Sequence, residues 1–143
     1  MTYKSIADLL SAAKQQKKKI SQLILADQAK EMEKTTAEVY AQMENSFDVM
    51  CESVVHGMDP KQKSTSGLTG GEGYKMQTYA QKTSGGLSGI FLTRAMSRAL
   101  AVSGCNASMG KIVATPTAGS CGILPGCLVS LYEDKSFDKK DIV

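Results

Sequence analysis

The sequence predicts an all-α fold, a mostly helical domain whose helices are joined by glycine-rich loops. Apolar residues recur at positions i, i+3, i+4 and i+7 through the first 58 residues, and serine or threonine precedes these stripes. Twelve of the thirteen glycines lie from Gly67 onward, where they separate further segments of helical periodicity. The 143 residues, of which 42% are hydrophobic and 22% charged, fit one globular domain spanning 1–143.

Three helices are expected in residues 1–58. Ser5 is predicted to cap the first helix, and Ser21 is predicted to begin the second. Thr35 or Thr36 is predicted to cap the third, and Glu38, three residues after Thr35, fits a capping box. The apolar stripe of the first helix comprises Ile6, Leu9, Leu10 and Ala13, and that of the third comprises Val39, Met43, Phe47, Met50 and Val54. Residues 1–58 are therefore predicted to form a helical scaffold.

Composition changes sharply after residue 58, and residues 59–143 are rich in glycine. Residues 61–73 are predicted to form a loop, and composition alone favours a flexible linker over a ligand-binding loop. A short amphipathic helix is expected over 74–82 and a longer one over 88–103. Gly104 is predicted to stop the longer helix, since glycine commonly follows the last helical residue.

The most distinctive segment is the turn Thr115-Pro116-Thr117-Ala118-Gly119-Ser120. It joins an extended apolar run, 111–114, to a helix expected over 121–132, which Ser120 is predicted to cap. Proline fixes one backbone angle and glycine permits angles closed to other residues, so the turn is expected to be tight. Because free N–H groups at a helix start lie beside hydroxyl groups here, the turn suits a small anion such as a carboxylate.

The end of the chain carries one more helix signal. Asp138 is predicted to cap a helix that begins at Lys139, and the sequence stops four residues later at Val143. A helix that begins and does not continue is the pattern we expect of a truncated chain.

Charge and glycine spacing exclude several function classes. Residues 61–130 carry seven basic residues and one acidic residue, which favours an anionic small molecule. The basic residues are not clustered and aromatic residues are few, so a nucleic-acid partner is not expected. The glycines do not form a dinucleotide or Walker A fingerprint. No apolar run approaches the roughly 18–20 residues that span a bilayer, and no signal peptide is visible, so we expect a cytoplasmic protein.

Cysteine, histidine and lysine can act in catalysis or bind metals, but here each is expected to have a structural or surface role. The cysteines are Cys51, Cys105, Cys121 and Cys127. They form neither a C-x-x-C pair nor a zinc pattern, and all four are expected to be small buried hydrophobic residues. His56, the only histidine, is expected to be a surface group at a helix end, so a Ser–His hydrolase lacks support. Lys111 is expected to position the turn or to meet solvent.

Arg94 and Arg98 lie four residues apart and share one helix face. A solvent-exposed stripe is the favoured interpretation of this pair. Contact with a carboxylate or a partner is the alternative.

The segment from Asn106 to Gly126 resembles, almost residue for residue, the hallmark segment of the iron–sulfur-dependent L-serine dehydratase (L-serine ammonia-lyase) alpha chain. Ser66-Gly67-Leu68-Thr69-Gly70-Gly71 and Leu87-Ser88-Gly89 resemble two further segments of that family at fitting spacing. The resemblance covers nearly the whole chain. It also implies that a part is missing, because the family's alpha chain is about twice this length and its cluster cysteines would follow Val143.

The resemblance implies that L-serine is converted to pyruvate and ammonia by a [4Fe–4S] cluster, without pyridoxal phosphate. These 143 residues would hold the amino acid rather than the metal, so Cys121 is expected to line the site or to pack under it, and not to be a cluster ligand. The carboxylate would be bound by Thr115, Thr117, Gly119 and Ser120. The pocket would be closed by Ser66, Thr69, Gly70 and Gly71. Asn106 would either orient the substrate through its amide or serve as a cap or turn residue.

The resemblance further implies a beta-type subunit or domain and a homo- or hetero-oligomer. Alone, this chain is expected to be inactive and to expose apolar surface. Thr65 stands where some family members have histidine, so the general base is not assigned. Two alternatives stay open: a non-catalytic anion-binding or assembly module, and a related iron–sulfur dehydratase that acts on a hydroxy acid or threonine.

Overall fold

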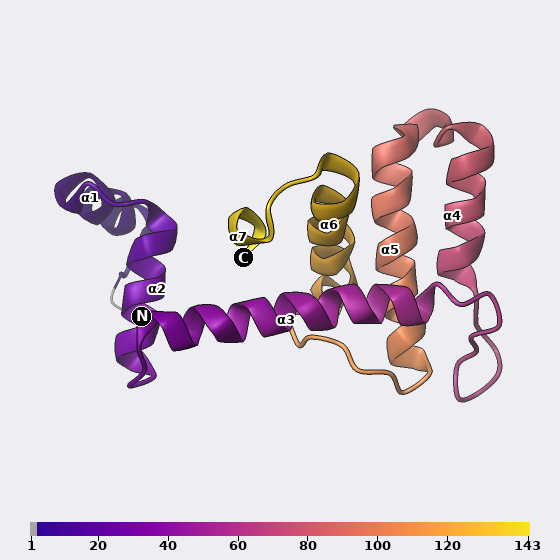
Figure 1. Ribbon diagram of the computed structural model, residues 1–143, viewed down its shortest axis with the longest axis horizontal. Helices are drawn as coiled ribbons and strands as arrows, with labels where there is room; N and C mark the ends of the chain where they lie inside the picture. The colour runs from indigo at the N-terminus through magenta and orange to yellow at the C-terminus, as the bar shows by residue number, and fades with distance from the viewer. Residues whose placement is uncertain (1–2) are drawn as a thin grey trace. The chain divides into compact units, whose positions relative to one another are not determined.

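The computed structural model describes residues 3–143 and contains seven α-helices and one 3-10 turn, with no strand in that range. The predicted all-α fold is confirmed. The helices are α1 Ile6–Gln16, α2 Ile20–Glu31, α3 Thr36–Gly57, α4 Glu72–Thr83, α5 Gly89–Ala107, α6 Ser120–Lys135 and α7 Lys139–Ile142, with the 3-10 turn at Gly86–Ser88 (Figure 1). The chain divides into two packing units, one up to Glu44 and one from Asn45 to Val143.

The helix starts of the first unit follow the predicted capping signals. The Ser5 hydroxyl accepts a hydrogen bond from the Asp8 N–H at 3.1 Å. The Thr35 hydroxyl accepts from the Glu38 N–H at 3.2 Å, and the Glu38 carboxylate accepts from the Thr35 N–H at 2.8 Å. Two predicted caps are therefore confirmed. The second helix begins at Ile20 rather than at Ser21.

The apolar stripes of the first unit are only partly buried. No residue of α1 is buried, and Ile6 is 78% exposed. Val39 is buried as predicted, but Met43 is 52% exposed, so the predicted stripe of α3 is wrong at that position. The sequence period places Met43 on the apolar face, yet no neighbouring element of this unit covers it.

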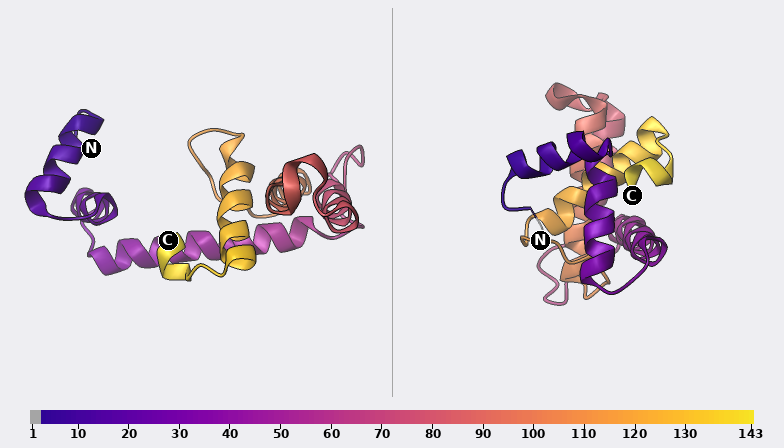
Figure 2. Two further views of the ribbon diagram at one scale, coloured as in Figure 1. Left: turned by 90° about the horizontal axis from the view of Figure 1, so that it is seen from above. Right: turned by 90° about the vertical axis from the view of Figure 1, so that its left-hand side faces the viewer.

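In the second unit the core joins three helices. Phe47, Met50 and Val54 of α3 pack with Val102 of α5 and Val129 of α6. The rings of Phe47 and Tyr132 meet edge to face, with 5.5 Å between centroids. Helix α5 lies between α4 and α6 and packs on both (Figure 1). Figure 2 shows α4 and α5 nearly end-on beside each other in the view from above.

Glycines bring two helices against the backbone of α5. A Cβ atom added at Gly57 would lie 1.8 Å from the Ala101 carbonyl oxygen. A Cβ atom added at Gly126 would lie 2.7 Å from the Ala95 carbonyl oxygen. Real atoms do not approach so closely, so α3 and α6 reach α5 only because no side chain stands at these positions.

Helix α5 does not stop at Gly104, as the sequence predicts, but continues to Ala107. The Gln62 side chain packs against Gly104 and donates its amide hydrogen bonds to the Gly104 carbonyl and the Ser108 hydroxyl. Gly104 therefore makes room for a neighbouring loop and does not end the helix. Gln62 lies 42 residues away in sequence, which hides this role from local reasoning.

Arg98 forms a buried ion-pair network between α5 and α6. Its residue exposure is 5%, and its guanidinium lies 2.6 Å from the Glu133 carboxylate and 2.7 Å from the Asp134 carboxylate. Arg94 contacts the same Asp134 carboxylate at 3.0 Å. The predicted solvent-exposed stripe is therefore wrong, and the alternative, contact with carboxylates, is correct within the chain itself.

Within residues 3–143, no helix is both long and apolar enough to cross a bilayer. The last helix, α7, begins at Lys139 after Asp138, as predicted. The Asp138 side chain makes no capping hydrogen bond there.

Candidate functional site

Hydroxyl groups gather at the turn that leads into α6. The Ser120 Oγ lies 2.6 Å from the Thr115 Oγ1 and 3.0 Å from the Thr117 Oγ1. The Thr115 hydroxyl also lies 3.1 Å from the Thr117 carbonyl oxygen. Each hydroxyl has one hydrogen, and all three have acceptors within the turn: the Ser120 Oγ donates to the Thr117 carbonyl at 2.7 Å, the Thr115 Oγ1 donates to the same carbonyl, and the Thr117 Oγ1 donates to the Ser120 Oγ. A hydroxyl can donate to a ligand only by giving up one of these bonds.

The cap of α6 differs from the predicted one. Ser120 is the first residue of the helix, and its hydroxyl accepts a hydrogen bond from the Thr117 N–H at 3.2 Å. The Thr117 hydroxyl accepts in turn from the Ser120 N–H at 3.3 Å. This reciprocal pair has the pattern of a capping box centred on Thr117. The prediction that Ser120 itself caps the helix is wrong: Gly119 occupies the N-cap position, and the hydroxyl that bonds an N–H of the helix start is that of Thr117.

The turn keeps two backbone donors free within the described residues. No hydrogen bond of residues 3–143 engages the N–H groups of Ala118 and Gly119. Gly119 lies in open space, since a Cβ atom there would meet no atom within 4 Å. These N–H groups stand at the N-terminus of a sixteen-residue helix, where the helix dipole favours negative charge.

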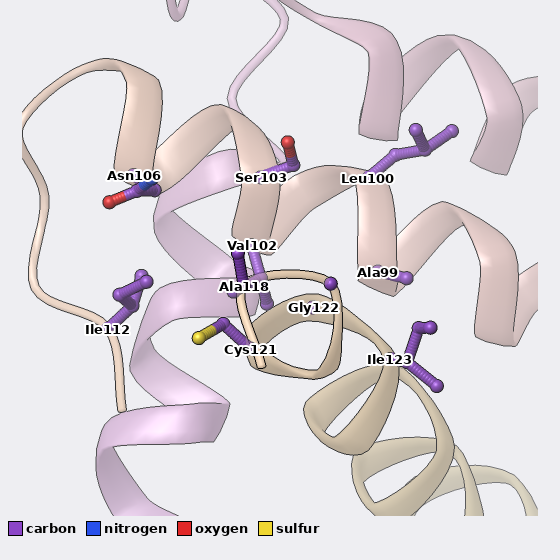
Figure 3. Close-up of a pocket in the computed structure, with 11 residues that line it drawn as sticks. Ala99, Leu100, Val102, Ser103, Asn106, Ile112, Ala118, Cys121, Gly122 and Ile123 are labelled. Atoms are coloured by element: carbon purple, nitrogen blue, oxygen red, sulfur yellow. The ribbon is translucent and has the colours of Figure 1, made fainter. Parts of the chain in front are cut away.

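A pocket of about 220 Å³ lies between α5 and the start of α6. Figure 3 shows Asn106 and Ile112 at one end and Ala99 and Ile123 at the other, with the Cys121 thiol directed towards Ile112. The predicted site residues Asn106 and Gly119 line this pocket, whereas the other predicted residues do not. Asn106 lies in the last turn of α5, on its exposed side.

Helix α5 also contributes lining residues that the sequence analysis did not single out. Leu100 and Ser103 face this pocket from one side of the helix. Periodicity alone predicts a helix face at these positions. It does not indicate that the face borders a pocket.

Cys121 lies at the pocket, as expected, and its thiol is partly exposed. The Thr115 hydroxyl lies 3.2 Å from its sulfur. Hydrogen bonds with the Thr115 side chain and backbone lower the pKa of the Cys121 thiol below its ordinary value. A hydrogen bond to the thiolate stabilises the charged form, so this cysteine is more acidic than a free one.

The glycine-rich loop is ordered by its own hydrogen bonds and by α5. The Ser64 N–H donates to the Thr69 carbonyl at 2.9 Å, and the Thr65 N–H donates to the Ala107 carbonyl at 3.0 Å. The Ser66 Oγ lies 3.1 Å from the Ser64 Oγ. The loop is therefore fastened to the C-terminal end of α5, which argues against a flexible linker.

Two glycines of this loop have steric reasons for their identity. A Cβ atom at Gly70 would lie 2.1 Å from the Gln62 carbonyl oxygen. Gly71 has a φ of 75°, a conformation that glycine adopts without strain, and it precedes α4. The Gly70 N–H already donates to the Glu72 carboxylate at 2.9 Å, which lowers the pKa of Glu72. Gly70 thus permits close approach, and its N–H is not free for an anion.

The cysteines are all free and lie in different surroundings. Cys105 is buried and burial raises the pKa of its thiol, Cys51 is half-buried, and Cys127 is exposed. The prediction that all four are buried is therefore confirmed only for Cys105: Cys51 and Cys121 are partly exposed, and Cys127 is exposed. Among residues 3–143, no group of three or more histidine, cysteine, aspartate or glutamate side chains is placed to hold a metal ion. His56 and Lys111 are exposed, as expected.

Comparison with known proteins adds an independent observation. The family model described as serine dehydratase alpha chain matches residues 15–143. The chain belongs to the serine dehydratase alpha-chain family. It is 36% identical to the probable L-serine dehydratase alpha chain of Bacillus subtilis (strain 168) over 131 residues, covering 92% of this chain and 43% of that relative.

A second member of this family gives the same result. The chain is 37% identical to the L-serine dehydratase alpha chain of Peptoniphilus asaccharolyticus over 125 residues, covering 87% of this chain and 42% of that relative. The chain therefore spans less than half the length of these two relatives. No solved structure matches it significantly.

Proposed function

We propose that this chain is the substrate-binding part of an L-serine ammonia-lyase, which dehydrates and deaminates L-serine to pyruvate and ammonia. Family membership supports this assignment, because both relatives above carry the name L-serine dehydratase. The single observation that carries it is the turn 115–120, where hydroxyl groups and free N–H groups meet at a helix N-terminus.

The turn is proposed to hold the carboxylate of the substrate. The N–H groups of Ala118 and Gly119 donate to its oxygens, and a hydroxyl of Thr115, Thr117 or Ser120 adds a further donor when it exchanges its hydrogen bond within the turn for one to the carboxylate. Each hydrogen bond to a charged group contributes about 1.5–3 kcal/mol to binding. An uncharged ligand of the same size loses this term, so the turn favours an amino acid over an amino alcohol.

The remaining predicted residues are proposed to shape the site. Asn106 faces the pocket beside the turn, where its amide offers one acceptor and two donors to the amino acid. Ser66 and Thr69 offer hydroxyls from the glycine-rich loop. Gly70 lets the loop pack against the backbone of Gln62, and Gly71 provides the positive φ at which the loop turns into α4.

The Lewis acid is proposed to come from outside these 143 residues. The described side chains do not form a metal site, so they do not fit a [4Fe–4S] cluster. If the rest of the enzyme held such a cluster, it would supply a Lewis acid for the substrate hydroxyl, while this chain would hold the amino acid in place. A beta-type subunit or domain of the same enzyme is the proposed partner, and the cytoplasm is the proposed location.

Titration of the ¹⁵N-labelled chain with L-serine tests the carboxylate site. Amide shifts are expected at Ala118, Gly119 and Ser120 and should saturate with L-serine. Serinol, which replaces the carboxylate with a hydroxymethyl group, serves as the matched control and should leave these signals unmoved. Equal shifts with both compounds, or shifts confined to other residues, would contradict the proposed site.

A further inference from the structure

An apolar groove runs along the exposed side of α5 and α6. We call it the α5–α6 groove; its lining residues are Leu92, Ala95, Met96, Ala99, Ile123 and Cys127. Its volume is about 150 Å³. Leu92 is 53% exposed and Ile123 is 61% exposed, so large apolar side chains face water here. An exposed apolar patch of this kind commonly marks a protein interaction site.

The groove is continuous with the pocket of the candidate site. Ala99 and Ile123 line both the groove and the pocket. Figure 3 shows these two side chains at the end of the pocket opposite Asn106 and Ile112. A segment seated in the groove therefore reaches the edge of the proposed serine site.

The chemistry of the groove defines the chemistry of its occupant. None of its six lining residues carries a formal charge. Arg94 and Arg98, on the same helix α5, are directed to carboxylates of α6 instead. The occupant must therefore present an uncharged apolar face, and side chains at i, i+3 and i+4 of a helix form such a stripe.

We propose that the α5–α6 groove is the docking site for the part of a serine dehydratase alpha chain that has no counterpart in these 143 residues. This rests on the proposed function. More than half of each of the two relatives lies outside the region that this chain matches. A helix from that part covers the groove and closes the open end of the pocket at Ala99 and Ile123.

Cys127 provides a native probe of the groove, since it is exposed and lines it. The experiment compares this chain alone with a single polypeptide that joins it to the part of the Bacillus subtilis alpha chain outside the matched region. Alkylation of Cys127 by a bulky maleimide is followed by peptide mass spectrometry. A Lys82→Cys variant supplies an exposed reference thiol on α4.

We expect Cys127 to react at least tenfold more slowly in the joined polypeptide, while the reference thiol of the Lys82→Cys variant reacts equally in both. Equal Cys127 rates in the two proteins would overturn the proposal. Protection of Cys127 in this chain alone, rising with concentration, would also overturn it, because a second copy would then be the occupant. Circular dichroism checks that each protein is helical.

A substitution pair tests the same surface by another route. Ile123→Glu places a charge in the groove and is expected to restore Cys127 alkylation in the joined polypeptide. Val55→Glu is the matched control, since Val55 is 72% exposed on α3 and lies outside the groove. Protection that survives Ile123→Glu, or that Val55→Glu abolishes equally, would contradict docking in the groove.

The two proposals fail separately in this design. A joined polypeptide that protects Cys127 but forms no pyruvate from L-serine, when reconstituted anaerobically with iron and sulfide and with any beta partner present, would refute the proposed function and leave the groove assignment standing. Pyruvate formation with Cys127 fully reactive would refute the groove assignment and leave the function standing.

Discussion

Replacing Asp134 with asparagine should destabilise the α5–α6 pair strongly. The Asp134 carboxylate accepts from Arg98 at 2.7 and 3.2 Å and from Arg94 at 3.0 Å. The Arg98 side chain is only 6% exposed, and removal of one partner from a buried pair costs about 3–5 kcal/mol. Because Glu133 still contacts Arg98 at 2.6 Å, we expect the lower end of that range, about 3 kcal/mol.

Amide hydrogen exchange in increasing urea measures this loss in the α5 and α6 peptides alone, so the other packing unit does not enter the result. Glu52→Gln is the control, because Glu52 is an exposed acid on α3 and should change stability by less than about 0.5 kcal/mol. A loss of less than about 1 kcal/mol for Asp134→Asn would refute the argument that this network is buried and necessary.

The same network predicts a dependence on pH. Burial alone would raise the pKa of Asp134, but hydrogen bonds from Arg98 and the charges of Arg98 and Arg94 outweigh it and lower the pKa. The folded pKa then lies below the unfolded value of about 3.9, so the contribution is complete above that value and is lost as pH falls through the folded pKa. The difference between the natural chain and Asp134→Asn should therefore shrink on acidification below about pH 4. A difference that stays constant down to about pH 2 would contradict this assignment.

Two further outcomes follow from packing. Gly57→Ala should destabilise the second unit by about 1–3 kcal/mol or more in urea unfolding, because its Cβ would meet the Ala101 backbone. Gly119→Ala is the control and should leave stability nearly unchanged, because a Cβ atom there meets no other atom. Similar losses for both variants would count against the close crossing of α3 and α5. Iodoacetamide should modify Cys127 in the folded chain but Cys105 only after unfolding, because Cys105 is buried and the pKa of its thiol is raised. Mass spectra that show prompt labelling of both cysteines would contradict the packing described for α5.

Signals that act over three or four residues could be predicted from the sequence. Ser5 and the Thr35–Glu38 capping box are confirmed because donor and acceptor lie in one turn of chain. The turn 115–120 is also local, so its position before α6 could be predicted, and only the choice of Ser120 as the capping residue is wrong. Here Thr117 offers an equally suitable hydroxyl one turn earlier, so composition does not decide between Thr117 and Ser120.

Features that depend on distant partners could not be predicted. Gly104 has the sequence pattern of a helix stop, yet Gln62 from a loop 42 residues away decides its role. Arg98 has the spacing of an exposed charge, yet Glu133 and Asp134 on another helix bury it. The pocket could not be predicted either, because it depends on the packing of one side of α5 against the start of α6.

Pyruvate release from L-serine is the measurement that tests the central claim most directly. The joined polypeptide would be reconstituted anaerobically with iron and sulfide, with any beta partner present, and compared with its Thr117→Val and Thr117→Ser variants. Loss of one hydrogen bond to the carboxylate should lower kcat/KM by about tenfold or more in Thr117→Val, and Thr117→Ser should recover most of it. Unchanged kcat/KM in Thr117→Val, with turnover of L-serine intact, would contradict a carboxylate site at this turn.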